Sequence, residues 1–283
     1  IQISGSKKEE HISAYHYFQV EDYQAAQFEV TIKSDKDFYV FGDTFQGSAK
    51  GWYLFGAPMG GEKINWYYYL KPTYYSPPGY EGFDFTRDYY DVEQEREEKY
   101  LGSGDGVLNE KGEFPLSVKL TDNANMGPYI LSVEGTVQSA NRQYVSGYKE
   151  FFLHPGEYYI GVKPFNRFLS SKESLKFQTL VLTPDGKPLR GQKIKLEILK
   201  RQWNSVRKEG MNGETRWVSE KFDEVVQKFD VTSKEELIDL EFQPEKAGLY
   251  IIRASGTDTK KNEVITETYF YASGSDYVSW ARY

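Results

Sequence analysis

Cysteine is absent from the 283 residues, and histidine and methionine occur only three times each. Without cysteine the chain forms no disulfide bond, zinc–thiolate site or cysteine nucleophile. No apolar run is long enough to span a bilayer, so no membrane-spanning segment is predicted. The formal net charge is −7, and lysine and arginine form no long stripe. Nucleic acid is therefore disfavoured as a partner, because phosphate binding needs a concentrated basic surface.

Aromatic residues are by contrast abundant, at 17% of the chain, with 24 tyrosines and 18 phenylalanines. Tyrosine, phenylalanine, valine, isoleucine and threonine fit the pleated, half-buried surface of a sheet, so the composition predicts an all-β protein. A length of 283 residues suits two domains of ordinary size.

The sequence contains an internal repeat. The segment FEVTIKSDKDFYVFGD at 28–43 aligns with YYIGVKPFNRFLSSKE at 158–173, and GAPMGGEKINW at 56–66 aligns with GKPLRGQKIKL at 186–196. Both alignments have the same offset of 130 positions. A shared offset of this kind indicates one structural module that occurs twice.

Two further blocks define the ends of these modules. GPYILSVEGT at 127–136 aligns with GLYIIRASGT at 248–257, and a closing block occurs three times, as SAYHYFQV, SGYKEFFL and TETYFYAS. The chain starts with isoleucine and has no signal peptide, so we expect a processed or excised piece of a longer array. The predicted units are the last strand or strands of a preceding module at 1–20, whole modules at 21–153 and 154–272, and the start of a next module at 273–283.

Each module has the pattern of an immunoglobulin-like or fibronectin-III-like β-sandwich. QFEVTI and KIKLEIL alternate apolar and polar residues, and TPDGKP and FGAPMGG supply turn residues between strands. About seven short strands per module are expected. The first module is longer, and its excess is assigned to the Tyr-, Pro- and acid-rich stretch at 71–100.

Several segments resemble the macroglobulin domains of the bacterial alpha-2-macroglobulin family. VEDYQAAQFEV at 20–30 is similar to the opening of such a domain, although Ala26 stands where the family usually has proline. YLFGAPMGGEKINW, FFLHPGEYYIGVKP, LTPDGKPLRGQKIKLEILKRQW and KAGLYIIRAS follow in the expected order. The resemblance covers nearly the whole chain and implies two tandem macroglobulin-type sandwiches.

The resemblance also implies a function for the parent protein. Members of this family trap proteases: a bait segment is cut, the molecule rearranges, and a Cys–Gln thioester can attach to the attacker. Because the chain lacks cysteine, the thioester domain is not in this piece. The implied role is a non-catalytic scaffold without cofactor, in contact with neighbouring macroglobulin domains and, through the full-length protein, with target proteases. The implied location is the bacterial periplasm or cell envelope, with a lipid anchor as an option.

Motion of such an array would be controlled where modules meet, at 17–26 and 151–158. We assign Tyr23, Phe28, His154 and Tyr158 to these junctions, and we expect Tyr23 and Tyr158 to be buried against neighbouring modules.

An alternative function rests on the aromatic residues of segment 64–92. Alternate rings of a strand point to opposite faces, so some of them should lie outside the core. Outward tyrosine and tryptophan can contact a glycan or a protein partner, as in a tandem-sandwich adhesin. The competing interpretation is packing against the adjoining module. The candidate contact residues are Trp66, Tyr68, Tyr74, Tyr75 and Tyr80.

No set of residues predicts catalysis or a metal site. His11, His16 and His154 are interpreted as surface or junction residues, since a metal needs three or four convergent ligands. The Gly-rich stretch 101–112 is interpreted as a flexible hairpin loop, because no helix follows it as a phosphate loop requires. TDNANMG at 121–127 offers oxygen ligands but lacks the spacing of a calcium loop.

Overall fold

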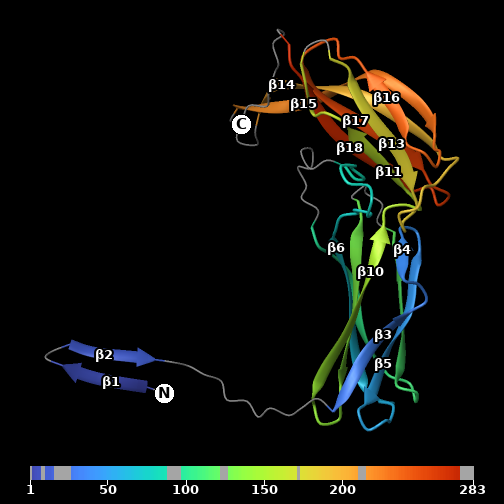
Figure 1. The fold of residues 1–283 in the computed structure, drawn as a ribbon. Helices are drawn as coiled ribbons and strands as arrows, with labels where there is room; N and C mark the ends of the chain where they lie inside the picture. Colours follow the sequence, from blue (N-terminus) through green and yellow to red (C-terminus); the bar gives the residue numbers. More distant parts are fainter. Residues whose placement is uncertain are drawn as a thin grey trace.

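The computed structural model describes residues 2–7, 10–15, 27–87, 97–121, 127–170, 173–209 and 215–274, all in strands, turns and loops without a helix. These residues form two β-sandwiches placed end to end, and a separate two-stranded hairpin precedes them (Figure 1). The predicted all-β class and tandem sandwich architecture are confirmed. No segment of the described chain is a helix long and apolar enough to cross a membrane.

The first sandwich pairs a three-stranded sheet, in the order β3-β5-β8, with a five-stranded sheet, in the order β4-β10-β9-β6-β7. Its strands are β3 (Phe28–Ser34), β4 (Phe38–Val40), β5 (Thr44–Tyr53), β6 (Lys63–Pro72), β7 (Lys99–Val107), β8 (Glu113–Lys119), β9 (Tyr129–Gln138) and β10 (Tyr144–His154).

The second sandwich repeats this arrangement, with sheets in the orders β11-β13-β16 and β12-β18-β17-β14-β15. Its strands are β11 (Tyr159–Pro164), β12 (Phe168–Leu169), β13 (Leu175–Leu182), β14 (Lys193–Glu209), β15 (Thr215–Thr232), β16 (Ile238–Phe242), β17 (Gly248–Thr257) and β18 (Glu263–Ala272). Each strand of one sandwich therefore has a counterpart in the other, and the sequence repeat is a repeat of the fold.

Alternation along the strands builds the core of each sandwich. In β3, Phe28, Val30 and Ile32 are buried and the residues between them are exposed. Their side chains meet residues of the facing sheet, including Ile64 and Leu131, in one cluster. A second cluster fills the other sandwich. Burial of each such side chain stabilises the fold by about 1.5–3 kcal/mol, which explains why a period of two specifies the register.

The hairpin at the N-terminal end consists of β1 (Gln2–Lys7) and β2 (Glu10–Tyr15), which pair antiparallel. Its two strands form a sheet of their own, and Figure 1 shows this hairpin apart from both sandwiches. Residues 16–26, which include His16 and the predicted junction residue Tyr23, lie outside the described residues.

The Gly-rich stretch 101–112 was expected to be a flexible hairpin loop, and this expectation is wrong for residues 101–107, whereas residues 108–112 do form a turn. Residues up to Val107 belong to the edge strand β7, which pairs with β6. Glycine allows aromatic rings to lie across this strand: a Cβ atom on Gly104 would be 2.5 Å from the Trp66 ring, and one on Gly106 would be 2.2 Å from the Phe114 ring. The glycines thus serve close packing rather than flexibility.

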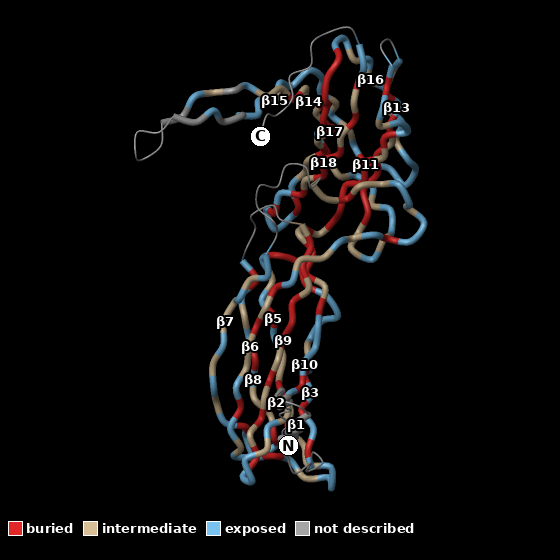
Figure 2. The backbone as a smooth tube through the Cα atoms, turned by 90° about the vertical axis from the view of Figure 1, so that its left-hand side faces the viewer, coloured by how far each residue is buried: buried red, intermediate tan, exposed pale blue. Residues whose placement is uncertain are grey.

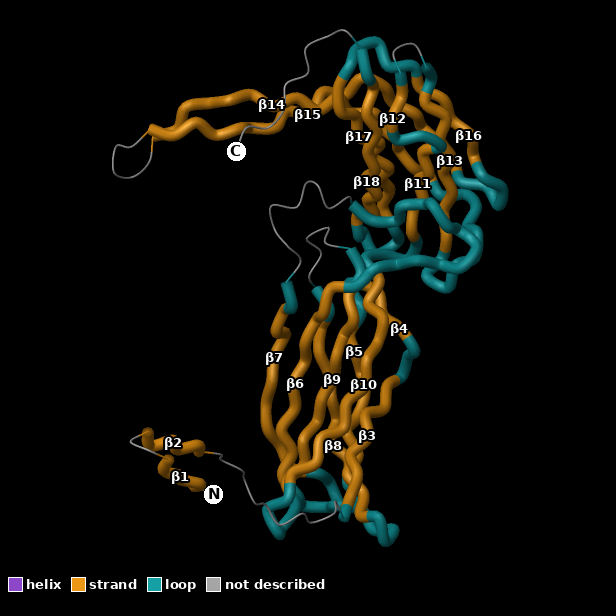
Figure 3. The backbone as a smooth tube through the Cα atoms, turned by 60° about the vertical axis from the view of Figure 1, so that its left-hand side comes forward, coloured by secondary structure: helices purple, strands orange, loops and turns teal. Residues whose placement is uncertain are grey.

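The long hairpin β14–β15 extends beyond the second sandwich as a two-stranded projection (Figures 2 and 3). We call its outer part, residues 203–209 and 215–221, the arm. Where the arm leaves the sandwich, the buried Arg201 donates to both carboxylate oxygens of Asp223, at 2.7 Å each. This two-point ion pair braces the base of the arm.

Candidate functional site

The junction of the two sandwiches brings together most of the residues that the sequence singled out. Strand β10 ends at His154 and β11 starts at Tyr159. The connection between them is therefore only four residues long, which places the sandwiches end to end (Figure 3). A linker this short restricts relative motion only if side chains or loops also cross the boundary.

A segment of the first sandwich crosses it. Residues 73–87, which we call the strap, leave the end of β6 and run along the second sandwich. Asp84 and Val162 exchange two backbone hydrogen bonds, at 2.9 and 3.0 Å, and the Glu267 N–H donates to the carbonyl of Thr86 at 3.2 Å. The strap therefore pairs with the open edges of β11 and β18, and it covers backbone groups that another chain could otherwise pair with.

Aromatic packing holds the strap in place. Phe85 is buried in a cluster with Tyr159, Leu180 and Leu182 of the second sandwich. Tyr75 stacks on Tyr159 with ring centroids 3.7 Å apart and planes only 3° from parallel. This cluster is separate from the cores of the two sandwiches. It is a third hydrophobic cluster, built from the strap and the outer face of the sheet that contains β11 and β13.

The hydroxyl of Tyr75 also has a partner across the junction. It donates to the carbonyl of Thr183 at 3.0 Å. Burial raises the pKa of Tyr75 to about 12. The ring therefore remains neutral and keeps donating at physiological pH.

Polar contacts add specificity to the strap. Arg167 donates to Asp84 and to Thr268, at 2.7 and 2.8 Å, and Lys163 donates to the carbonyl of Glu81 at 3.0 Å. The Arg167 and Asp84 side chains are 35% and 37% exposed. A pair this accessible stabilises by about 0–1 kcal/mol, so the aromatic cluster carries most of the interface energy.

His154 lies at the centre of the junction and is buried. Its Nδ1 is 2.8 Å from the hydroxyl of Tyr159, its ring stacks on Phe152 at 4.4 Å, and Phe38 meets it edge-on at 5.1 Å. Burial lowers the pKa of His154 to about 4. The histidine is therefore neutral near pH 7, and a proton on it would place a charge inside the junction.

A turn of the second sandwich makes the other half of the contact. Asn262 donates through its side chain to the backbone carbonyl of Phe41 at 2.9 Å, and Lys260 pairs with Asp43 at 2.5 Å. Burial alone would raise the pKa of Asp43, but hydrogen bonds from Lys260, the Val40 N–H and Lys36 outweigh it and lower the pKa. The carboxylate thus stays charged and ties the two sandwiches together.

Two of the predicted junction residues lie elsewhere. Tyr158 was expected to be buried against the neighbouring module, but its ring is in the core of its own sandwich. Tyr159, one position later, faces the strap. Successive side chains of a strand point to opposite faces of the sheet. An assignment that is wrong by one residue therefore confuses a core residue with an interface residue. Phe28 is likewise in the core of the first sandwich. Of the three predicted junction residues that the structure describes, His154 alone is at this boundary.

The five aromatic candidates for partner contact are divided between three environments. Trp66 packs against the core of the first sandwich and Tyr68 is inside it, 1% exposed, so the Tyr68 ring cannot reach a partner. Tyr75 and Tyr80 pack in the strap cluster. Tyr74 is 61% exposed.

Metal binding has no support in the described part of the chain, where no group of three or more histidine, aspartate or glutamate residues could hold an ion. Asp122, Asn123 and Asn125 lie outside the described residues. His154 was expected to be a surface or junction residue. It lies at the junction, but it is not a surface residue, because its ring is buried.

Sequence reasoning missed the arm and found the strap only in part. Segment 71–100 was recognised as excess length, and packing against the adjoining module was one interpretation of the aromatic residues at 64–92, but the backbone pairing of the strap with the next sandwich was not predicted. For the arm, the Asn212-Gly213 pair is a hairpin turn signal within 203–221 that could have located it. This signal does not show that the hairpin extends beyond the sandwich.

Comparisons with known proteins agree with this architecture. Residues 27–146 match the family model described as bacterial alpha-2-macroglobulin MG5 domain. An alpha-2-macroglobulin homolog of Nostoc sp. is 26% identical over 270 residues, which are 93% of this chain and 14% of that protein. The chain therefore spans a small part of the length of this curated relative.

Solved structures show the same fold. The native conformation of Escherichia coli alpha-2-macroglobulin has a TM-score of 0.61 at 15% identity, with 94% of this chain and 17% of that chain covered. Salmonella alpha-2-macroglobulin reacted with methylamine has a TM-score of 0.60 at 15% identity, with 97% and 18% covered. Residues 27–146 thus form a domain of the bacterial alpha-2-macroglobulin MG5 family, and the resemblance of the chain to the bacterial alpha-2-macroglobulins is confirmed.

Proposed function

We propose that the two sandwiches are non-catalytic scaffold domains of a bacterial alpha-2-macroglobulin-like protease inhibitor that traps its target. The observation that supports this role is the strap. It joins the open edges of β11 and β18 and buries Phe85 and Tyr75 against the next sandwich. Two modules connected in this way transmit force as one body, which an array needs if bait cleavage is to change its overall shape.

The target proteases and the neighbouring macroglobulin domains belong to the full-length protein. We place that protein in the periplasm or cell envelope, where a lipid anchor would be compatible with its role. The relatives' names support the family, and the small share of their length that this chain covers leaves the protease trap as a proposal.

The test uses the full-length parent protein mixed with a protease such as trypsin. A trap leaves the active site of the bound protease intact but shields it from large molecules. Cleavage of a large protein substrate by the protease should therefore fall, while cleavage of a small peptide substrate persists. Replacing residues 71–98 of the parent by Asn-Gly should weaken this selectivity, since the strap is removed. Equal loss of both activities, or loss of neither, would contradict the proposal.

The adhesin alternative is less well supported. Of its five candidate residues, four pack in the core of the first sandwich or in the strap cluster, and Tyr74 alone is mostly exposed. A single ring offers little area for binding a glycan. Binding of a polysaccharide that disappears in a Tyr74→Ala variant would favour this alternative.

A further inference from the structure

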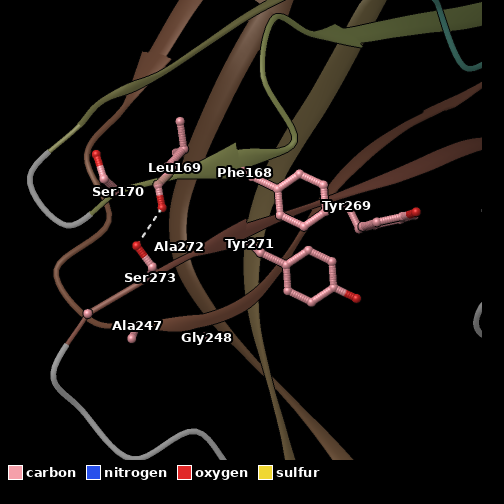
Figure 4. Close-up of a pocket in the computed structure, with 10 residues that line it drawn as sticks. Phe168, Leu169, Ser170, Ala247, Gly248, Tyr269, Tyr271, Ala272 and Ser273 are labelled. Carbon is pink, nitrogen blue, oxygen red and sulfur yellow. Dashed lines mark hydrogen bonds between the residues drawn. The ribbon is translucent and has the colours of Figure 1, made fainter.

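The second sandwich carries its own copy of the surface that the first sandwich uses at the junction. In the first sandwich β4 runs parallel to the end of β10, with Phe38 beside Phe152. In the second sandwich β12 runs parallel to the end of β18, with Phe168 beside Tyr271. Figure 4 shows the Phe168 and Tyr271 rings side by side, and their planes are 9° from parallel at 5.4 Å.

The turn after this short strand is also repeated. The N–H of Val40 donates to the carboxylate of Asp43 at 3.1 Å, and the N–H of Ser170 donates to the carboxylate of Glu173 at 2.9 Å. Glu173 follows Asp43 by the repeat offset of 130. Both sandwiches therefore present an acid at the same position of the repeat, in the turn after a strand whose phenylalanine pairs with an aromatic residue.

The two copies differ in what covers them. In the first sandwich, Lys260 of the next module pairs with Asp43, and His154 at the end of β10 is buried. Phe38 is 42% exposed, whereas its counterpart Phe168 in the second sandwich is 70% exposed. Ser273 is exposed at the end of β18, and a hollow of about 770 Å³ lies beside these residues. Within the described residues Glu173 has no lysine or arginine partner.

The arm leads to the same conclusion from another part of the fold. The strap is the first part of the connection between β6 and β7, and the counterpart of this connection is the one between β14 and β15. Strand β14 passes the end of the sandwich where Arg201 pairs with Leu249, close to Gly248 and Ala272, and continues as the arm. The arm exposes Trp217, and Phe222 is exposed five positions later in β15, at the base of the arm.

We propose that the face formed by Phe168, Glu173, Tyr271 and Ser273, together with the arm, is the docking surface for a further β-sandwich of the same family. The docked sandwich would place a cationic residue of one of its turns beside Glu173, in the way that Lys260 is placed beside Asp43. It would also pack against Trp217 of the arm, as the second sandwich packs against the strap. This inference rests on the proposed scaffold function, since it assumes an array that continues.

Zero-length cross-linking of the full-length parent with a carbodiimide tests the contact, because the reagent joins a carboxylate to an amine without a spacer and therefore favours groups in direct contact. Asp43 and Lys260 supply an internal positive control. Glu173 should be joined to a lysine of a later module, and this product should be lost in a Glu173→Gln variant. Glu110, an exposed acid in the turn between β7 and β8, is the matched negative control.

Hydrogen exchange gives a second readout that does not need a lysine in the partner. The amides of residues 168–170 should exchange more slowly in the parent than in the 283-residue chain. Equal exchange in both, or a Glu173 product only with other molecules such as a separate protein, would overturn the docking proposal. Loss of protease trapping with the Glu173 cross-link intact would instead contradict only the proposed function.

Discussion

The two sandwiches share their strand order but use one connection in opposite ways. Between β6 and β7 the first sandwich inserts a chain that bends across the boundary as the strap, whereas the second sandwich extends β14 and β15 into a straight arm. The strap contains prolines at 77 and 78, which lack the N–H that a ladder needs, and glycines at 79 and 82, whose positive φ angles form turns. The arm lacks proline, and its two strands stay paired along their described length. The same position in a fold can therefore bind a neighbour or project from the surface, according to local turn chemistry.

Removing each insertion separately is the strongest way to break this comparison. Leu70 pairs with Lys99, so Asn-Gly can replace residues 71–98, and Gln202 pairs with Phe222, so Asn-Gly can replace residues 203–221. Loss of the strap uncovers Tyr159, Leu180 and Leu182 and should destabilise the second sandwich by several kcal/mol. Loss of the arm should leave the unfolding free energy of the second sandwich nearly unchanged. Both deletion variants are compared by urea unfolding and by the rate of proteinase K cleavage at 155–158. Equal effects of the two deletions would refute the conclusion that the strap stabilises the junction and the arm does not.

A single substitution sharpens the same contrast. Tyr159→Ala removes the stack with Tyr75 and the partner of His154, and should cost about 3–5 kcal/mol of unfolding free energy. Tyr158→Phe is the matched control in the adjacent residue. The Tyr158 hydroxyl is buried without a hydrogen-bond partner among the described residues, so its removal should be neutral or slightly stabilising. If thermal and urea unfolding showed similar losses for both variants, the assignment of the two rings to core and interface would be incorrect.

The junction should weaken in acid because of His154. The folded protein holds its pKa at about 4, against 6.5 for an unperturbed histidine. The unfolded state therefore binds the proton first as the pH falls. The stabilisation is complete above pH 6.5 and disappears between pH 6.5 and 4, a loss of about 3 kcal/mol.

The control for this pH effect is His154→Phe, which retains packing against Phe38 and Phe152 but cannot titrate. Urea midpoints measured from pH 7.5 to 4 should decline less steeply for this variant than for the wild type. A slope that is unchanged in the variant would show that other groups cause the acid sensitivity.

The smallest effect is expected at the polar contacts of the strap. Asp84→Asn keeps the backbone pairing with Val162 but removes the charge beside Arg167, and should cost about 0–1 kcal/mol because both side chains are partly exposed. The loss should shrink further in high salt. A cost near that of Tyr159→Ala, measured by the same urea unfolding, would mean that charge rather than aromatic packing holds the strap.

Much of the architecture was predictable from local pattern. The offset of 130 residues identified two copies of one module, and alternation such as that of Phe28, Val30 and Ile32 located strands and their buried faces. These inferences succeed because the side-chain period of a strand is two and because a repeated sequence repeats its fold. The aromatic excess of 64–92 also indicated interdomain packing as one of two interpretations, and the strap occupies part of that segment.

By itself, then, the sequence determined an all-β tandem array, the repeated modules and the absence of cysteine chemistry. Only the tertiary structure decided that Tyr159 rather than Tyr158 meets the neighbour, that the glycines of β7 lie under aromatic rings, and that one insertion folds over the junction while its counterpart projects. The physical reason is the range of the interactions. Alternation depends on adjacent residues, whereas the choice between core, interface and solvent depends on contacts such as Tyr75 with Tyr159, which join residues far apart in the chain.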